Sequence, residues 1–311
     1  MEFYNHFLAV KLLDFERIDF YILNSNKESN RMTRVQDRHS IWFQEVSARP
    51  GFAIRRGHGL PLIFVHGSGV DHHIFDDLDP VFERVGGFER IYLDQPGFGR
   101  TPPDPSILDL DGLARWLDDQ VDIFSGGGPF ALLGNSLGGL LSRHAAAGRL
   151  DRCRGMALLS SVVDPVTAHR RLPPRQVLVR DDQCLADVDE FTRHAYRQMA
   201  VVESREHLEA YQRTIMPGIR SADADTVARM EGHYQLDMDF DQVWSGFIAP
   251  VLLVCARQDD RVGYLDQFDL ACRFPRASYS VLDRAGHNVQ IEQTALVCDL
   301  LEDWARQVLK G

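Results

Sequence analysis

The chain has 311 residues, 44% of them hydrophobic and 25% charged, so it can bury a sizeable core as one large domain or as a domain with an insertion. Its formal net charge of −11 argues against a nucleic acid partner, because phosphate backbones are bound by an excess of basic side chains. No apolar run reaches the length of a transmembrane helix, and five cysteines without Cys-x-x-Cys spacing suggest neither a disulfide framework nor a zinc site, so we expect a cytoplasmic protein that does not contact membranes.

The first 31 residues differ in composition from the rest of the chain. They hold Lys11 and Lys27, whereas Lys310 is the only lysine that follows. We interpret residues 1–31 as an N-terminal extension outside the core, with Met32 as the natural start. The alternative is a genuine helix over residues 3–20 that docks on a partner.

The core is predicted to begin at about residue 40. Two short segments rich in β-forming residues, 41–46 and 51–56, suggest an antiparallel hairpin. The apolar run 62–65, bounded by Pro61 and Gly67, is typical of a strand that is covered on both faces. Strands are then expected at 91–94, 130–133, 156–160, 250–256 and 278–282, with helices at 107–124, 138–148, 264–272 and 293–309. This alternation favours the α/β class with a mostly parallel, right-handed βαβ sheet.

The pattern changes over residues 163–248. No strand signal appears there, and short polar-faced helices are predicted at 188–202, 206–215 and 222–233. We expect a helical cap, or lid, inserted between two parts of the core, 40–162 and 249–311. A cap over the carboxyl ends of the strands excludes water and shapes a substrate pocket. The alternative is a helical excursion that covers a sheet edge.

A Gly-x-Ser-x-Gly pattern around Ser136 joins a predicted strand to a predicted helix. Gly134 and Gly138 permit the tight strand-to-helix turn of a nucleophile elbow, which exposes a serine hydroxyl to both a base and a substrate. The same five residues alone also fit a glycine-rich turn that carries an incidental serine. The rest of the chain must therefore supply the other catalytic groups.

Asp259 and His287 each follow a predicted parallel strand, as Ser136 does. Because the carboxyl ends of parallel strands meet at one sheet edge, we expect these three side chains to lie together. Asp260 and Asp164 remain alternatives for the acid. An earlier strand ends in the sequence His-Gly-Ser-Gly at 66–69, whose backbone N–H groups suit an oxyanion site.

The order nucleophile, acid, base resembles that of the α/β-hydrolase superfamily, across nearly all of residues 40–309. The chain looks most like capped, single-domain serine hydrolases. The resemblance implies that Ser136 attacks a carbonyl, that His287 takes and returns the proton, and that Asp259 fixes the imidazole tautomer. The motifs that carry it are residues 66–69, 94–100, 134–139, 258–259 and 285–287.

The resemblance also implies an oxyanion hole made by the backbone N–H groups of Ser68 and Leu137, with Gly69 as the alternative to Ser68. We expect no cofactor and no metal ion, because the histidines near this loop lack an acidic or cysteine partner at ligand spacing. Three polar residues near the loop and the elbow are instead predicted to line the substrate pocket: His66, Asn135 and His72.

The predicted substrate is a small molecule with a carbonyl group, most favourably a carboxylic ester. Asparagine beside the nucleophile, as at Asn135, resembles the pattern of carbon-carbon hydrolases. Asn288, however, stands after the histidine at the position where those enzymes often carry tryptophan. An aminopeptidase, an acyltransferase and, from another class, a non-catalytic ligand receptor on the same scaffold remain alternatives. The sequence does not indicate the oligomeric state.

Overall fold

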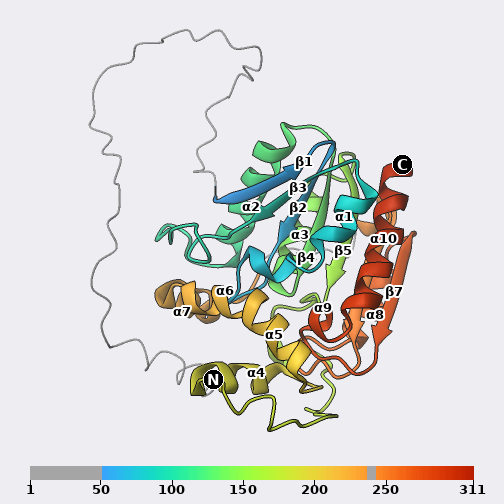
Figure 1. The fold of residues 1–311 in the computed structure, drawn as a ribbon. Coiled ribbons are helices and arrows are strands. Elements are labelled where there is room, and N and C mark those ends of the chain that lie inside the picture. The colour runs from blue at the N-terminus through green and yellow to red at the C-terminus, as the bar shows by residue number, and fades with distance from the viewer. Residues whose placement is uncertain (1–50, 237–242) are drawn as a thin grey trace. The chain divides into compact units, whose positions relative to one another are not determined.

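The computed structural model describes residues 51–236 and 243–311. Within these residues the core is a seven-stranded sheet of order β1-β3-β2-β4-β5-β6-β7 (Figure 1). β1 pairs antiparallel with β3, and the other neighbours are parallel, which confirms the predicted α/β class. The strands are β1 (Ala53–Gly57), β2 (Leu60–Val65), β3 (Phe88–Leu93), β4 (Phe130–Asn135), β5 (Cys153–Leu159), β6 (Val251–Ala256) and β7 (Ala277–Leu282).

The start of the predicted core is only partly visible. The expected extension 1–31 and the expected strand 41–46 lie outside the described residues. The expected strand 51–56 corresponds to β1, which takes β3 as its partner. This pairing joins segments about 35 residues apart, and local sequence patterns carry no signal for it.

Apolar runs become central strands because both of their faces are covered. In β2, Ile63 lies in one apolar cluster with Leu117 and Leu140 of the helices on one face. Phe64, the next residue, points the other way and meets the Phe82 ring edge-on, with 5.2 Å between ring centroids. Successive side chains of a strand alternate between its two faces, so such a run fits a sheet with helices on both sides.

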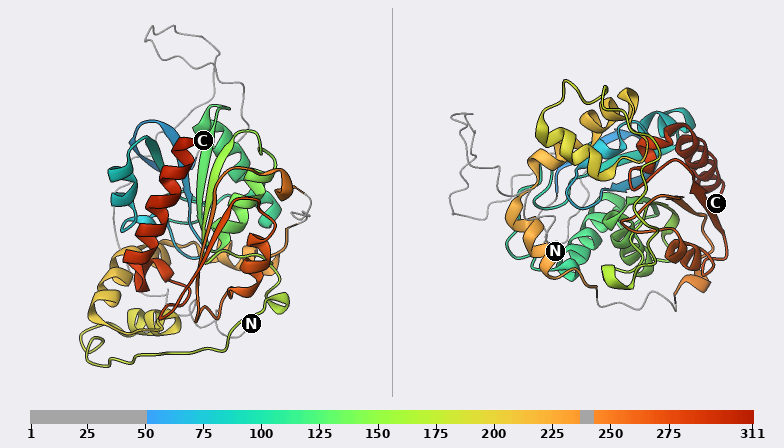
Figure 2. Two further views of the ribbon diagram at one scale, coloured as in Figure 1. Left: turned by 90° about the vertical axis from the view of Figure 1, so that its right-hand side faces the viewer. Right: turned by 90° about the horizontal axis from the view of Figure 1, so that it is seen from below.

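Helices form two outer layers. Figure 2 shows α3 and α10 on opposite sides of the sheet. The α1 and α10 layer includes an edge-on contact between Phe82 and Trp304, whose ring centroids are 6.5 Å apart. The helices α2, α3, α8 and α10 correspond to predicted helices, whereas η2, α1 and α9 were not predicted. Four residues, as in η2 and α9, carry too little periodicity. The core helices are the 3-10 helix η2 (His72–Phe75), α1 (Asp79–Val85), α2 (Leu110–Ser125), α3 (Leu137–Ala147), α8 (Leu265–Ala271), α9 (Val289–Glu292) and α10 (Thr294–Lys310).

Residues 163–248 link β5 to β6, and we call them the inserted segment. Its described residues form helices and one isolated parallel bridge between Val179 and Val202. α6 packs on the loop after β2 so closely that a Cβ on Gly218 would lie 2.4 Å from the Asp71 nitrogen. The inserted segment therefore lies at the carboxyl ends of the strands. Its helices are η3 (Thr167–His169), α4 (Glu190–Met199), α5 (Arg205–Thr214), α6 (Met216–Ser221), α7 (Ala224–Gly232) and η4 (Trp244–Gly246).

Among the helices of residues 51–236 and 243–311, none combines the length and the apolar composition that a transmembrane helix needs.

Candidate active site

Ser136 occupies a strained turn between β4 and α3. Its φ of 53° and ψ of −118° are rare for a residue with a side chain. Three backbone hydrogen bonds hold this conformation: the Ser136 nitrogen donates to Leu159, and its carbonyl oxygen accepts from Gly139 and Val162, at 3.0 Å each. The strain is therefore maintained by the surrounding backbone, as a nucleophile elbow requires.

The two motif glycines permit the turn because other backbone atoms approach them closely. A Cβ on Gly138 would lie 1.9 Å from the Val65 oxygen, and one on Gly134 would lie 2.5 Å from the Gly138 oxygen. Any side chain at either position would push α3 away from the sheet. The sequence pattern thus predicted a close approach that the tertiary structure makes.

Successive side-chain contacts connect Ser136 to His287 and His287 to Asp259. The Ser136 Oγ is 3.0 Å from His287 Nε2, and His287 Nδ1 is 3.0 Å from Asp259 Oδ2. Asp259 is fully buried, whereas 12% of the His287 side chain is exposed. Both contacts have hydrogen-bond length, so a proton on Ser136 has an acceptor, and that acceptor has an anion behind it.

The loop after β6 fixes the orientation of Asp259. Its Oδ1 accepts the backbone N–H groups of Arg261, at 2.9 Å, and Val262, at 3.1 Å. This leaves Oδ2 directed at His287. Of the three candidates for the acid, the structure brings Asp259 to the histidine.

The two alternative acids point elsewhere. Asp260 lies 3.7 Å from Arg175 and 3.6 Å from Arg261. Asp164 accepts the Val166 N–H at 2.8 Å and lies 3.0 Å from the His169 ring. Adjacent positions in sequence are therefore far from equivalent at a strand end, since successive side chains face different neighbours.

The loop predicted to bind an oxyanion lies beside the nucleophile. A Cβ on Gly67 would be 3.0 Å from Ser136 Cβ, which places the neighbouring Ser68 and Gly69 next to the elbow. Leu137 is the first residue of α3, and the first N–H groups of a helix have no acceptor within that helix. The predicted donors thus belong to two backbone segments that meet at the serine, the loop after β2 and the start of α3.

His66 belongs to the framework of this loop. It is fully buried, its Nε2 accepts the Gln95 N–H at 3.0 Å, and its Nδ1 lies 2.7 Å from the Gly67 oxygen. Burial lowers the pKa of His66, so the ring is neutral, with its proton on Nδ1. Both ring nitrogens bond to backbone groups, so His66 supports this loop, and its place in a substrate pocket stays a prediction.

Asn135 and His72, which are also predicted to line the pocket, bond to distant groups as well. The Asn135 Nδ2 donates to the Leu159 oxygen at 3.3 Å, and His72 Nδ1 lies 2.8 Å from Asp94 Oδ1. Both residues are 3% exposed. Their partners lie on β5 and directly after β3, and the place of both residues in a substrate pocket stays a prediction.

The structure also places an acid beside the histidines where none was expected. Asp71, His72 and His73 offer possible metal-ligand atoms within 4.8 Å of one another. Asp71 Oδ1 accepts the His73 N–H at 3.1 Å and lies 2.9 Å from His73 Nδ1, so this carboxylate caps η2. The three residues already bond to protein groups, and a cation would have to displace those bonds.

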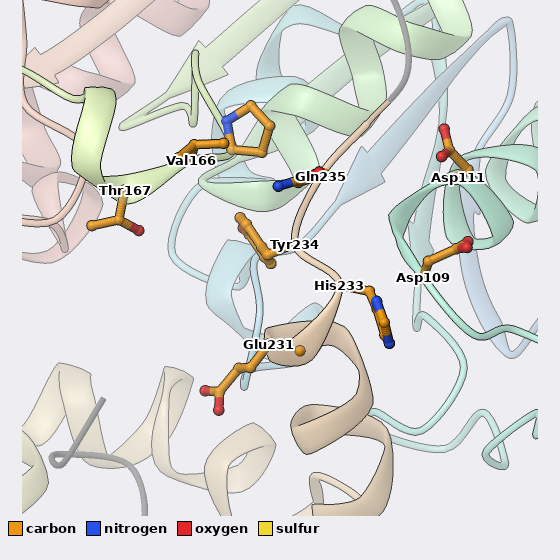
Figure 3. Close-up of a pocket in the computed structure, with 10 residues that line it drawn as sticks. Asp109, Asp111, Val166, Thr167, Glu231, His233, Tyr234 and Gln235 are labelled. Carbon is orange, nitrogen blue, oxygen red and sulfur yellow. The ribbon is translucent and has the colours of Figure 1, made fainter.

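A separate pocket of about 470 Å³ lies between the start of α2, the loop after β5 and the end of α7. Figure 3 shows Asp109 and Asp111 on one side of it and Val166 and Thr167 on the other. Burial raises the pKa of Glu231 in this pocket. Ser136 and His287 do not line it. The lining residues are Asp109, Asp111, Pro165, Val166, Thr167, Glu231, Gly232, His233, Tyr234 and Gln235.

Glu292 is a residue of this region that the sequence reasoning did not single out. It is 8% exposed, and its Oε2 accepts the N–H of Gly286, the residue before His287, at 2.7 Å. A glutamate five residues after the candidate base was the available signal. Its importance became visible only with its distant partners.

Known proteins share this arrangement of strands and helices. A family model described as the alpha/beta hydrolase family matches residues 62–300. The chain is 29% identical over 260 residues to 2-succinyl-6-hydroxy-2,4-cyclohexadiene-1-carboxylate synthase of Salmonella typhimurium, covering 78% of this chain and 93% of that protein. It is 34% identical over 92 residues to a pimeloyl-[acyl-carrier protein] methyl ester esterase of Legionella pneumophila, covering 30% of this chain and 34% of that one.

A solved structure gives the same result for the fold. An alpha/beta superfamily hydrolase of Oenococcus oeni PSU-1 superposes with a TM-score of 0.77 at 24% identity, covering 82% of this chain and 95% of that one. The predicted fold and the predicted resemblance are both confirmed. The chain belongs to the alpha/beta hydrolase family.

Proposed function

We propose that the protein is a serine hydrolase that cleaves a small carbonyl substrate, most favourably a carboxylic ester, through an acyl-enzyme on Ser136. The observation that carries the proposal is the line of contacts from Ser136 Oγ through His287 to Asp259, each of 3.0 Å. The esterase among the relatives supports the choice of an ester. No cofactor enters the proposed reaction.

In the first half of the proposed reaction, His287 Nε2 takes the Ser136 hydroxyl proton while Oγ bonds to the carbonyl carbon. The carbonyl electron pair moves to oxygen and then returns, which breaks the bond to the leaving group. The leaving group takes the proton from His287 and departs as an alcohol. Water then loses a proton to His287, attacks the acyl carbon and releases the carboxylic acid, while Ser136 recovers its proton.

Asp259 has an electrostatic part in this proposal. With Oδ1 held by two backbone N–H groups, its Oδ2 accepts a hydrogen bond from the Nδ1–H of His287 and leaves Nε2 free as the base. The carboxylate also stabilises the imidazolium that forms when Ser136 is deprotonated. The same line of atoms argues against the non-catalytic receptor, since a ligand-binding protein has no need of an aligned acid, base and nucleophile.

The developing oxyanion is assigned to the backbone N–H groups of Leu137 and Ser68, with Gly69 as the alternative. A preorganised donor of this kind contributes about 3 kcal/mol to transition-state stabilisation. The inserted segment, at the carboxyl ends of the strands, acts as a cap that shapes the substrate pocket. Specificity is therefore assigned to residues 163–248 and the catalytic chemistry to the sheet edge.

Ester hydrolysis by the wild type and by Ser136→Ala tests the proposal. With short p-nitrophenyl esters, we expect Ser136→Ala to lower kcat by about 10⁶-fold, to the level of background hydrolysis. A fluorophosphonate should add one covalent group to the wild type, and none to Ser136→Ala, by intact mass. Equal hydrolysis rates of the two proteins would contradict the proposal.

Ser142→Ala is the matched control. Ser142 lies in the same helix and is fully buried, and within the described residues its Oγ has no hydrogen-bond partner. Removing this hydroxyl should leave both hydrolysis and labelling unchanged, because no bond is lost. A large loss in Ser142→Ala would show that disturbance of α3, and not loss of the nucleophile, lowers activity.

A second candidate function comes from the relative that matches over the greater length. That relative is a synthase, and the alignment covers 93% of it. A thermal-shift titration with 2-succinyl-6-hydroxy-2,4-cyclohexadiene-1-carboxylate distinguishes the two candidates. Tight binding of that compound without ester hydrolysis would favour the synthase.

A further inference from the structure

Glu292 binds three backbone N–H groups from two segments, one only 6 residues away in the chain and the other 90 to 91 residues away. It is the last residue of α9 and is 8% exposed. Its Oε2 accepts from Gly286 at 2.7 Å, and its Oε1 accepts from Val201 at 2.6 Å and from Val202 at 2.9 Å. Hydrogen bonds to a buried carboxylate are among the strongest in proteins, so Glu292 holds both segments firmly.

One of these segments carries the candidate base. Gly286 directly precedes His287, so a bond to the Gly286 nitrogen fixes the backbone from which the imidazole projects. Gly286 also packs tightly, because a Cβ there would lie 2.8 Å from Val201 Cγ2 and 3.2 Å from the Met199 oxygen. The loop of His287 and the end of α4 are thus in direct contact across Glu292.

The other segment belongs to the inserted part of the chain. We call residues 198–202 the clamp strip; they comprise the last two residues of α4 and the three residues after it, and they also meet the loop of the candidate acid. Arg261 donates from its guanidinium to the Gln198 oxygen at 3.2 Å, while its backbone N–H donates to Asp259. The clamp strip therefore contacts both the loop that carries His287 and the loop that carries Asp259.

Glu203, the residue that follows the clamp strip, contacts Arg180 and Asp181 of the inserted segment. Glu203 is fully buried at its side chain, and its oxygens lie 2.7 Å from Arg180 and accept the Asp181 N–H at 3.0 Å. Those partners belong to the inserted segment itself. Glu203 holds the inserted segment together, whereas Glu292 ties it to the core.

We infer that Glu292 is a positioning residue that seats the clamp strip on the His287 loop, so that docking of the inserted segment and alignment of His287 with Ser136 are coupled. The inference rests on the proposed hydrolase function. Burial raises the pKa of Glu292, whereas its three N–H donors act to lower it. Loss of the carboxylate leaves the Gly286 nitrogen without its acceptor and frees the loop beside the base.

Glu292→Gln tests the inference, with Glu203→Gln as the matched control. The amide of Glu292→Gln keeps one oxygen but turns an NH₂ group toward one set of N–H donors. We expect kcat for ester hydrolysis and the rate of Ser136 phosphonylation to fall by about 10- to 100-fold, with a smaller change in KM. Glu203→Gln should change KM, while kcat and phosphonylation stay within about threefold of the wild type.

Hydrogen-deuterium exchange gives a readout that needs no turnover. Glu292→Gln should speed exchange both in residues 283–289 and in the clamp strip. Glu203→Gln should speed exchange within the inserted segment and leave residues 283–289 at the wild-type rate. Glu292→Asp keeps the carboxylate on a shorter side chain and should recover part of the lost kcat. Should Glu292→Gln not fold, Glu292→Asp carries the same comparison of rates and exchange.

Two outcomes would overturn the inference. In one, Glu292→Gln retains wild-type phosphonylation and wild-type exchange at 283–289. In the other, Glu203→Gln loses as much kcat as Glu292→Gln, which would mean that general loosening of the inserted segment is enough. Failure of the hydrolase proposal has a different signature, since hydrolysis would then survive in Ser136→Ala while the exchange comparison remained readable.

Discussion

Two His–Asp pairs with fully buried aspartates lie at the same edge of the sheet, and of these two only one contacts a nucleophile. In the first, His287 Nδ1 is 3.0 Å from Asp259; in the second, His72 Nδ1 is 2.8 Å from Asp94. Both aspartates are fully buried. By distance and burial alone, the two pairs would be assigned the same chemistry.

The pairs differ in what else each aspartate and each ring contacts. His287 presents Nε2 to Ser136, and 12% of its side chain is exposed, against 4% for His72. Asp94 also accepts the backbone N–H groups of His72 and of Arg100, both at 2.9 Å, so it ties two loops together. A buried His–Asp pair whose outer nitrogen contacts no nucleophile only stabilises the fold, and we call such a pair a brace. It becomes a candidate catalytic pair only where the outer nitrogen meets a nucleophile.

The largest expected effect separates the pairs by activity. Asp259→Asn should lower kcat for ester hydrolysis by about 10⁴-fold, because the amide favours the wrong tautomer of His287. The melting temperature, followed by circular dichroism, should change little relative to that loss. Retention of a tenth of the wild-type kcat would show that Asp259 is not the acid.

The next effect concerns stability. Asp94→Asn should cost about 3 kcal/mol of unfolding free energy in urea, because the buried His72 and two backbone N–H groups lose an anionic acceptor. The kcat of the folded fraction should stay within about threefold of the wild type, as expected for a brace. Asp182→Asn, whose side chain is 88% exposed, is the control and should change stability by less than about 0.5 kcal/mol.

The same brace should show a pH window in its stability. Burial lowers the pKa of His72, but the hydrogen bond and charge of Asp94, with Asp71 and Asp76, raise it above the ordinary value overall. Because the pKa of His72 is raised in the folded state, protonated His72 stabilises the fold fully below about pH 6.5. This stabilisation is lost as the pH rises through the folded-state pKa.

The aspartate sets the other limit of this window. Burial raises the pKa of Asp94, while the bonds from His72 and Arg100 lower it below its ordinary value overall. Its contribution is complete above about pH 3.9 and is lost as the pH falls. The stability difference between wild type and His72→Gln should therefore be largest between about pH 4 and 6.5. A difference that is constant from pH 4 to 9 would show that charge plays no part.

The smallest expected effect tests the two alternative acids. Asp260→Asn and Asp164→Asn should each leave kcat within about threefold of the wild type, because their carboxylates face arginines or a local turn. Ester hydrolysis under the conditions used for Asp259→Asn provides the measurement. A loss comparable to that of Asp259→Asn in either variant would transfer the acid role to that residue.

Much of this arrangement is predictable from the sequence, for local reasons. The glycines around Ser136 are required by a turn of five residues, and the apolar run of β2 reports burial on both faces. The positions of Asp259 and His287 after strands place them at one sheet edge by topology alone. Each of these inferences needs only neighbours in sequence and the rule for parallel strands.

The bonding partners of the polar residues near the motifs could not be predicted. His66, Asn135 and His72 are predicted to line a pocket because they are polar and close to motifs, and the structure bonds each of them to a group on another strand or loop. Polarity describes what a side chain can bond to, and only the fold supplies the partner. The choice among the candidate acids was open for the same reason, because it depends on which carboxylate the loop backbone turns toward the histidine.

The sequence by itself determined the class of fold, the elbow and the two strand ends that carry Asp259 and His287, because these follow from hydrophobic runs, glycines and chain order. The tertiary structure decided which of two His–Asp pairs meets Ser136, and it brought Glu292 to nitrogens about 90 residues away. Such contacts join segments whose separation in the chain carries no periodic signal. The local sequence pattern therefore indicates which side chains carry the chemistry, whereas tertiary packing decides which groups they bond to.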